Sequence, residues 1–162
     1  MLQVLVGYIL GAGVAVRWLV IGGDPKFFSI TKLIHNRLHG VPGDSGVLDG
    51  AAADAFESVQ IANAKAIAPQ VRPGDVVILH DPQTAGLAAA LKAVGAVVLW
   101  RCHVGTEARN DWTEEAWAFL RPHLVACDGF VFTRPEYVPE WLSMDRVSII
   151  PPPGPRPDGH GR

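Results

Sequence analysis

Cysteine is scarce in this chain, because its 162 residues include two, Cys102 and Cys127, each near the end of an apolar segment. Two isolated cysteines provide no disulfide framework, so a reducing cytoplasm is the expected compartment. Net charge is also slight, with 14 basic and 16 acidic side chains and a formal value of −2. This balance gives no reason to expect nucleic acid or an anionic membrane surface as a partner.

Several nucleotide-binding and catalytic signatures are missing from the sequence. It contains no G-x-x-x-x-G-K-[ST] loop, no G-x-G-x-x-G between a strand and a helix, and no G-x-S-x-G elbow. It also has no C-x-x-C and no H-E-x-x-H, and only His35 and His39 share a spacing, i and i+4, that suits metal ligands. We therefore expect no metal and no bound cofactor, and Cys102 fits a small buried residue better than a nucleophile.

The composition is that of a globular protein. Apolar residues make up 49% of the chain and charged residues 19%, which excludes a largely disordered chain. The length fits one domain, which we place at residues 1–150. The remaining residues, 151–162, read PPPGPRPDGHGR and cannot bury enough apolar surface to fold, so we predict a disordered tail.

The first 21 residues are strongly apolar but are interrupted by Gly7, Gly11, Gly13 and Arg17. A membrane span is one interpretation, because the run before Arg17 approaches the minimum length. We favour the end of a buried helix over residues 2–10, a glycine turn, and a buried strand over residues 14–21. No membrane partner is expected from this interpretation.

Strand and helix patterns then alternate. Asp24 and Pro25 are typical of a helix start, and apolar residues at helical spacing follow until Gly40. Short apolar runs predict strands, and Ala-rich or amphipathic stretches predict helices. The strands are expected at 76–79, 97–100, 130–132 and 147–150, and the further helices at 51–70, 84–94 and 112–124, with a turn or short helix at 137–142. This alternation predicts a three-layer α/β domain with a parallel sheet.

One strand–helix–strand unit, residues 74–105, carries the candidate site. The unbroken apolar runs of its two strands predict that both faces of each strand are buried, and each strand ends in polar side chains. In open parallel sheets, ligands bind outside the carboxyl ends of the strands. We therefore expect five side chains to meet on one rim: His80, Asp81, Gln83, Arg101 and His103.

Two interpretations of this rim stay open from the residues alone. A carboxylate and an amide at a helix N-terminus suit sugar hydroxyls, but Asp81 followed by Pro82 also fits plain helix capping. Arg101 could hold a carboxylate or phosphate, and His103 could donate to a substrate hydroxyl or stabilise developing charge. Alternatively, Arg101 pairs with a nearby acid and His103 is simply exposed on a loop.

A run of motifs in this order resembles a known family. The motifs are RWLVIGGDPKFF, TKLIHNRLHG, RPGDVVILHDPQTAGL, VVLWRCHVG, AWAFLRPHL, FTRPEYVPEWL and DRVSIIPP. Together they closely resemble the N-terminal half of glycosyltransferring trehalose synthases, which are retaining GT-B glycosyltransferases of family 4. The resemblance covers roughly residues 1–152 and implies a Rossmann-like domain on the acceptor side of a two-domain cleft.

The resemblance also implies an activity and roles for particular residues. Such enzymes transfer glucose from a nucleoside diphosphate glucose to free glucose, giving trehalose, without an obligate metal. By position, Asp81 and His103 would be the catalytic pair, with Asp81 on acceptor hydroxyls and His103 near the reacting centre. The substrate-binding residues would be Gln83, Arg101, His80, Lys32, His35 and Asn36.

The chain departs from the family pattern at both ends. The glycine-rich loop expected just before Met1, and with it the first strand of the sheet, is missing, and so is the second, nucleotide-binding domain with its Glu-x7-Glu motif. We therefore expect a fragment that binds glucose or a related acceptor but is inactive alone, and that uses NDP-glucose only with a partner half. Homo-oligomers are a further possibility, because a missing inner strand exposes a sheet edge.

Two other functions remain as alternatives. The chain could be a non-catalytic sugar-binding or subunit-interaction module. It could also be a small hydrolase that uses Cys102 or a bound metal, which we rank last.

Overall fold

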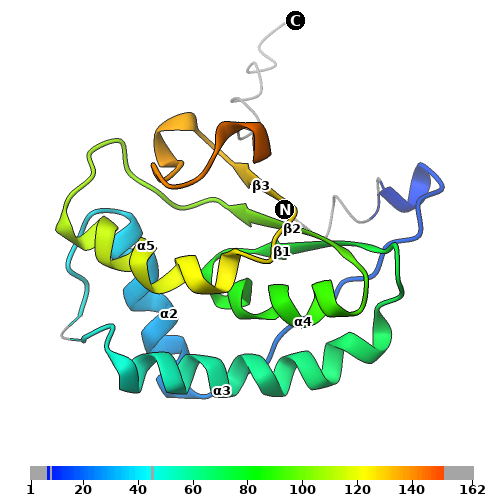
Figure 1. Ribbon diagram of the computed structural model, residues 1–162, viewed down its shortest axis with the longest axis horizontal. Coiled ribbons are helices and arrows are strands. Elements are labelled where there is room, and N and C mark those ends of the chain that lie inside the picture. Colours follow the sequence, from blue (N-terminus) through cyan, green and yellow to red (C-terminus); the bar gives the residue numbers. More distant parts are fainter. Residues whose placement is uncertain (1–6, 8, 45, 152–162) are drawn as a thin grey trace, which may run out of the picture.

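A computed structural model of the chain describes residue 7, residues 9–44 and residues 46–151. Four strands form one parallel sheet in the order β1–β2–β3–β4 (Figure 1). Their bounds are β1 Val76–His80, β2 Val97–Cys102, β3 Gly129–Phe132 and β4 Val147–Ile149. The predicted α/β fold with a parallel sheet is therefore confirmed. The predicted disordered tail lies outside the described residues except for Pro151, and the domain boundary at residue 150 stays a prediction.

The long helices begin where the sequence predicts, at side chains that cap them. Asp24 accepts the backbone N–H of Phe27 at 2.7 Å and starts α2, Pro25–Leu38. Asp49 does the same for α3, Gly50–Ile67, which continues into the short 3₁₀ helix η1, Ala68–Gln70. Asn110 caps α5, Asp111–Leu124. None of the described helices has both the length and the apolar character that a membrane span requires.

The segment after β1 differs from the single helix predicted over residues 84–94. It starts as a 3₁₀ helix, η2, Pro82–Leu87, and becomes α-helical only in α4, Ala88–Ala93. The turn expected over residues 137–142 is present, because the Leu142 N–H donates to the Pro139 carbonyl at 3.1 Å. The 3₁₀ turn η3, Pro135–Tyr137, precedes it, and a second 3₁₀ turn, η4, Met144–Arg146, precedes β4.

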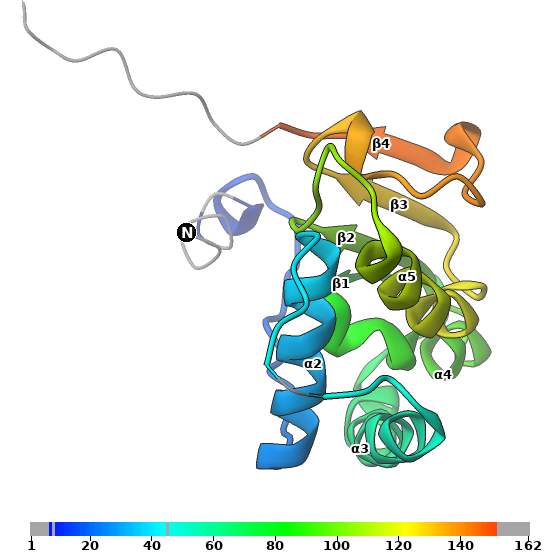
Figure 2. The same ribbon diagram turned by 90° about the vertical axis from the view of Figure 1, so that its left-hand side faces the viewer.

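The core lies between one face of the sheet and the helices. Trp100 of β2 and Phe132 of β3 point to this face, where both rings pack against Trp117 of α5. Helix α2 lies beside α5 (Figure 2), and the buried Arg37 of α2 forms an ion pair with Glu115 of α5 at 2.6 Å. These contacts fix α2 relative to the strands, which matters because α2 forms one wall of the site.

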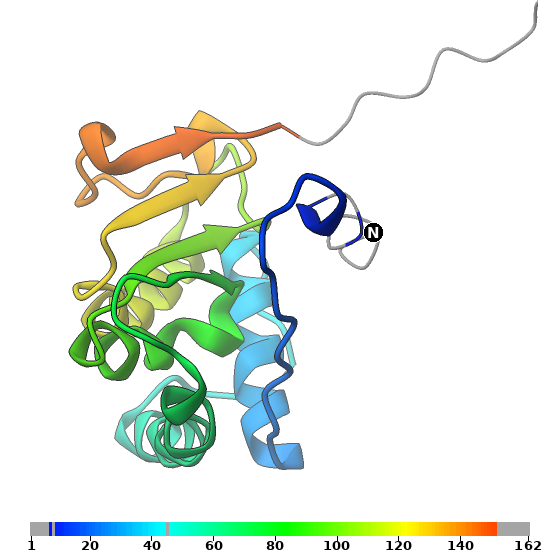
Figure 3. The same cartoon turned by 90° about the vertical axis from the view of Figure 1, so that its right-hand side faces the viewer.

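The opposite face of the sheet is open. Val76 and Ile78 of β1 are 62% and 51% exposed, and Val97 of β2 is 40% exposed. Figure 3 looks onto this face, where no helix covers β1 or β2. The prediction that these strands are covered on both faces is therefore wrong for the part of the chain that the structure describes.

Residues 14–21 do not form the predicted strand. They run as an extended coil apart from the sheet (Figure 3), and most of their side chains are exposed. Arg17 reaches Asp75, at 3.8 Å, and the backbone of Gly22 bonds to Asn63 of α3. None of the described strands pairs with this segment, and the outer edge of β1 is left unpaired. The helix expected over residues 2–10 lies largely outside the described residues.

Candidate functional site

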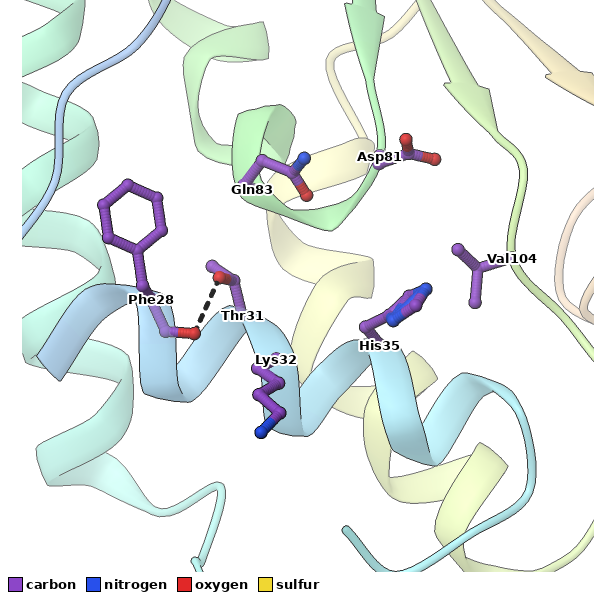
Figure 4. A pocket seen from close by; sticks show the side chains of 7 residues that line it. All are labelled: Phe28, Thr31, Lys32, His35, Asp81, Gln83 and Val104. Carbon is purple, nitrogen blue, oxygen red and sulfur yellow. Dashed lines mark hydrogen bonds between the residues drawn. The ribbon is translucent and has the colours of Figure 1, made fainter. Parts of the chain in front are cut away.

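A pocket of about 310 Å³ opens where the carboxyl ends of β1 and β2 face α2. Helix α2 forms one wall, and the residues that follow the two strands form the other (Figure 4). Its lining residues are Phe28, Thr31, Lys32 and His35 from α2, Asp81 and Gln83 after β1, and Val104 after β2.

Asp81 has the most unusual backbone at this site. Its φ of 63° and ψ of 175° lie in a region that side chains other than glycine rarely adopt, at a cost of about 1–3 kcal/mol. The backbone is held on both sides: the Asp81 N–H donates to the Arg101 carbonyl at 2.8 Å. The Asp81 carbonyl accepts from Trp100 Nε1 at 3.1 Å and from the Thr84 N–H at 3.2 Å.

The carboxylate of Asp81 does not cap the following helix, so the capping interpretation is wrong. Its Oδ1 accepts the backbone N–H of His103 at 3.0 Å and lies 3.1 Å from His103 Nδ1. The strained backbone turns the carboxylate away from η2 and toward the residue that follows β2. The two residues predicted to meet at the ends of neighbouring strands are therefore in direct contact.

His103 lies in the middle of a chain of hydrogen bonds. Arg101 donates from Nε to His103 Nε2 at 2.8 Å, and an arginine is always a donor. His103 Nε2 is therefore the acceptor, which leaves the proton on Nδ1, where it is donated to Asp81. Arg101 orders the imidazole in this arrangement, and the alternative in which Arg101 simply pairs with an acid is wrong.

Two neighbouring histidines, His80 and His35, have lowered pKa values, which favour their neutral forms. The His80 ring stacks on the His103 ring with centroids 5.6 Å apart and planes 12° apart. Burial, followed by the nearby His103, lowers the pKa of His80. Partial burial and then His39 lower the pKa of His35, the histidine that lines the pocket. Neutral imidazoles can both donate and accept, which suits hydroxyl groups.

Two of the predicted α2 residues contribute less to the pocket. Lys32 lines it, but its Nζ lies 3.1 Å from Asp44 and points away from Asp81 and Gln83 (Figure 4). Asn36 is not among the lining residues. Its side chain lies beside the following loop, where a Cβ added at Gly43 would meet Asn36 Nδ2 at 3.1 Å.

Sequence reasoning missed four residues of the site and its support. Phe28 and Thr31 share a helix face with Lys32 and His35, at i, i+3, i+4 and i+7, so helical spacing alone could have indicated them. Val104 gave no signal beyond its place after β2. Gln60 of α3 is 2% exposed and donates from Nε2 to the Gln83 carbonyl at 2.7 Å, a contact that no local pattern predicts.

Cys102 takes no part in this chemistry. Its side chain is fully buried, its Sγ lies 3.2 Å from the Val104 carbonyl, and burial raises the pKa of its thiol far above the usual range. A thiol at neutral pH is a poor nucleophile, so the hydrolase alternative based on Cys102 is wrong. Among the residues that the structure describes, no group of three or more His, Cys, Asp or Glu side chains is placed to hold a metal.

Comparisons with known proteins identify a family for this chain. A family model described as "Trehalose synthase, N-terminal domain" matches residues 1–139. Trehalose synthase from Pyrococcus horikoshii is 34% identical over 151 residues, which are 93% of this chain and 34% of that protein. Trehalose synthase from Rubrobacter xylanophilus is 31% identical over 153 residues, with 93% and 35% covered. The chain thus spans about a third of the length of these curated relatives.

A solved structure shares the fold. The N-terminal domain of trehalose-6-phosphate phosphatase from Candida albicans aligns with a TM-score of 0.57 at 14% identity, covering 83% of this chain and 31% of that one. At this identity the likeness concerns the fold alone, and it agrees with the N-terminal GT-B architecture expected from the sequence.

Proposed function

This chain belongs to the family of trehalose synthase N-terminal domains, and from that premise we propose that its pocket binds the sugar acceptor of a glucosyl transfer. The observation that carries the proposal is the direct contact between Asp81 and His103 at the edge of a pocket of about 310 Å³. That volume is at the small end of ligand sites and suits a monosaccharide.

The lining chemistry supports a neutral sugar. A hexose presents hydroxyls that donate and accept, above faces of C–H groups. Asp81 and Gln83 offer acceptors, Gln83 and His35 offer donors, and Phe28 offers an apolar surface. The lowered pKa of His35 favours its neutral form, and Lys32 is bonded to Asp44. Among the lining residues, Asp81 carries the only negative charge. That carboxylate would disfavour a phosphorylated sugar.

Asp81 and His103 would have different tasks. Oδ1 of Asp81 accepts the His103 N–H and lies 3.1 Å from His103 Nδ1, whereas Oδ2 lies 3.3 Å from Nδ1 and has no bond from the His103 N–H, so Oδ2 is better placed to accept a sugar hydroxyl. Both ring nitrogens of His103 are engaged, Nε2 by Arg101 and Nδ1 by Asp81, so in this arrangement His103 would hold the Asp81 carboxylate and present a C–H edge near the reacting centre. Arg101 would act through His103, as a positioning residue.

We further propose that the reaction served is transfer of glucose from a nucleoside diphosphate glucose, such as ADP- or UDP-glucose, to free glucose, giving trehalose with retention. Departure of the diphosphate requires opposing positive charge, and both sugars must be held together. The cations described at this rim are engaged: Lys32 bonds to Asp44 and Arg101 to His103. The chain therefore binds the acceptor but transfers nothing until another domain supplies the donor site.

Calorimetry tests the proposal. The chain should bind glucose or trehalose and give no heat with UDP-glucose. Asp81→Asn should weaken glucose binding about tenfold, the loss expected for one hydrogen bond to a charged group. Asp54→Asn, an exposed carboxylate on α3, is the matched control and should bind as the wild type does. No glucose binding, or binding that Asp81→Asn leaves unchanged, would contradict the assignment.

A complete homologous enzyme offers a test of catalysis. Alanine at the position that matches Asp81 or His103 should reduce transfer at least ~100-fold while the fold is retained. Unchanged turnover at both positions would remove these residues from the reaction.

A second candidate function, a subunit-interaction module, draws support from the open face of the sheet. Three apolar side chains of β1 and β2 are exposed there, and β1 stands at the edge of the described sheet. A module of this kind would bind a full-length synthase subunit and no sugar. Calorimetry with glucose and with such a subunit therefore separates the two candidates.

A further inference from the structure

We propose that Trp100 is a positioning residue for this site, because its indole N–H holds the Asp81 carbonyl and thereby keeps the Asp81 carboxylate on His103. The identity of the ligand rests on the proposed function, whereas the contact between Trp100 and Asp81 rests on geometry alone.

Asp81 requires such support. It is the sole residue other than glycine with a positive φ among the residues that the structure describes. A strained conformation of this kind persists only where the surroundings over-determine it. The Asp81 N–H is fixed by the Arg101 carbonyl, within the strand ladder. The Asp81 carbonyl must be fixed as well, or the peptide could rotate to a relaxed conformation.

Trp100 is the rigid donor to that carbonyl. Its side chain is 0% exposed, and its ring is held edge-on by Trp117 and Phe132, each with centroids 6.1 Å away. Its Nε1 lies 3.1 Å from the Asp81 carbonyl oxygen. The other donors to this oxygen, the N–H and hydroxyl of Thr84, come from η2 itself and move with it. Trp100 instead comes from β2 and connects the core directly to the site.

Rotation of the Asp81 peptide would have a defined effect. The carboxylate would leave both the His103 N–H, now at 3.0 Å, and His103 Nδ1, now at 3.1 Å. The imidazole would then lose the acceptor that fixes its tautomer. Loss of one N–H inside the core would therefore alter Asp81, which lines the pocket, and its hydrogen-bonded partner His103.

The test removes the N–H without changing the shape of the side chain. Trp100 is replaced by 3-benzothienylalanine, in which sulfur stands where the indole nitrogen was, and Trp100→Phe serves as an encoded second variant. Amide hydrogen exchange, resolved by NMR, should accelerate about tenfold at His103, the amide that bonds to the carboxylate. Exchange at Val98 of β2, whose N–H donates to the Asp128 carboxylate, and at Phe130 of β3 should not change. Glucose affinity should fall about tenfold.

The matched control is the same analogue at Trp117. Trp117 packs on Trp100, but the hydrogen bonds of the described residues include none from it to Asp81. Its variant should leave His103 exchange as in the wild type. Unchanged His103 exchange in the Trp100 variants, or equal acceleration in the Trp117 variant, would overturn the proposal. If His103 exchange accelerates although the wild type binds no sugar, the positioning role stands and the proposed function fails.

Discussion

Asp81 has a backbone conformation that favours glycine. Glycine should therefore be a more stable replacement than alanine at this position. At a φ of 63° a Cβ is crowded, and glycine avoids the penalty. We expect the free energy of unfolding of Asp81→Gly to be about 1–2 kcal/mol higher than that of Asp81→Ala. Both variants lose the carboxylate, so their difference isolates the backbone. Urea denaturation followed by circular dichroism measures it.

The same pair of substitutions at Asp54, within the exposed face of α3, provides the control. There alanine should be the more stable by about 1 kcal/mol, because glycine weakens a helix interior. If alanine were also the better residue at position 81, Asp81 would not be strained.

The histidines give the protein a pH dependence whose sign can be stated. Burial lowers the pKa of His35, His80 and His123 below the ordinary value of 6.5, although Asp81 raises it at His35 and His80, and Glu57 does so at His123. The unfolded chain therefore binds more protons than the folded chain once the pH drops below about 6.5. The free energy of unfolding should fall as the pH falls through that range.

Urea titrations between about pH 7.5 and pH 5.5 measure this slope. His80→Gln should flatten it, because glutamine keeps polar atoms at the site without a titration in that range. Burial, and then the nearby His103 and Arg101, lower the pKa of His80, against the raising effect of Asp81, so removal of His80 should reduce the slope measurably. A slope that His80→Gln leaves unaltered would show that His80 titrates alike in both states.

At the scale of the elements, η2 depends on a close approach to α3. A Cβ added at Gly86 would lie 2.5 Å from Gln60 Cγ, nearer than atoms normally come. Gln60 in turn holds the Gln83 carbonyl. Gly86→Ala should therefore lower the free energy of unfolding by about 1–3 kcal/mol and weaken glucose binding, because Gln83 moves with η2.

Gly50→Ala serves as the matched control for Gly86→Ala. No atom lies within 4 Å of a Cβ built there, at the start of α3, so alanine should leave stability unchanged or raise it by up to about 1 kcal/mol. Thermal melts compare the two variants. Equal stability of both variants would contradict the packing of η2 on α3.

Elements with a strong local pattern were predictable from the sequence. The Asp24–Pro25 start and the apolar stripe of α2 place that helix correctly, because capping and burial act within a few residues. The runs at residues 76–79 and 97–100 became β1 and β2 for the same reason. Residues 14–21 have an equally good strand pattern but form no strand, because a strand also needs ladder hydrogen bonds to a neighbour, and none of the described strands pairs with them.

The contact between residues of the candidate site was predictable from the sequence, but the details of their geometry were less so. The rule for parallel sheets correctly brings Asp81 and His103 together, because both follow strands that are neighbours. The positive φ of Asp81 and the roles of Trp100 and Gln60 depend on contacts across the fold. Of these, Gln60 and Gln83 are 23 residues apart in the chain, so no local pattern records their bond.

At the scale of the whole molecule, the open sheet face predicts self-association. β1 contains no charged residue or proline among Val76–Leu79, the features that usually protect a sheet edge. We expect sedimentation velocity to show dimers or larger species as concentration rises. Ile78→Lys should shift the weight-average mass toward the monomer. Ile61→Lys, at an exposed apolar position on α3, is the control and should not.

Because Asp81 is strained, a screen for stability and a screen for ligand binding should favour different residues at this position. A library screened only for soluble, well-expressed chains should enrich Asp81→Gly, because that screen rewards a relaxed main chain. A library screened for glucose binding should retain aspartate, because that screen rewards the carboxylate. Sequencing position 81 after each screen would therefore distinguish the residue that stabilises the fold from the residue that binding requires.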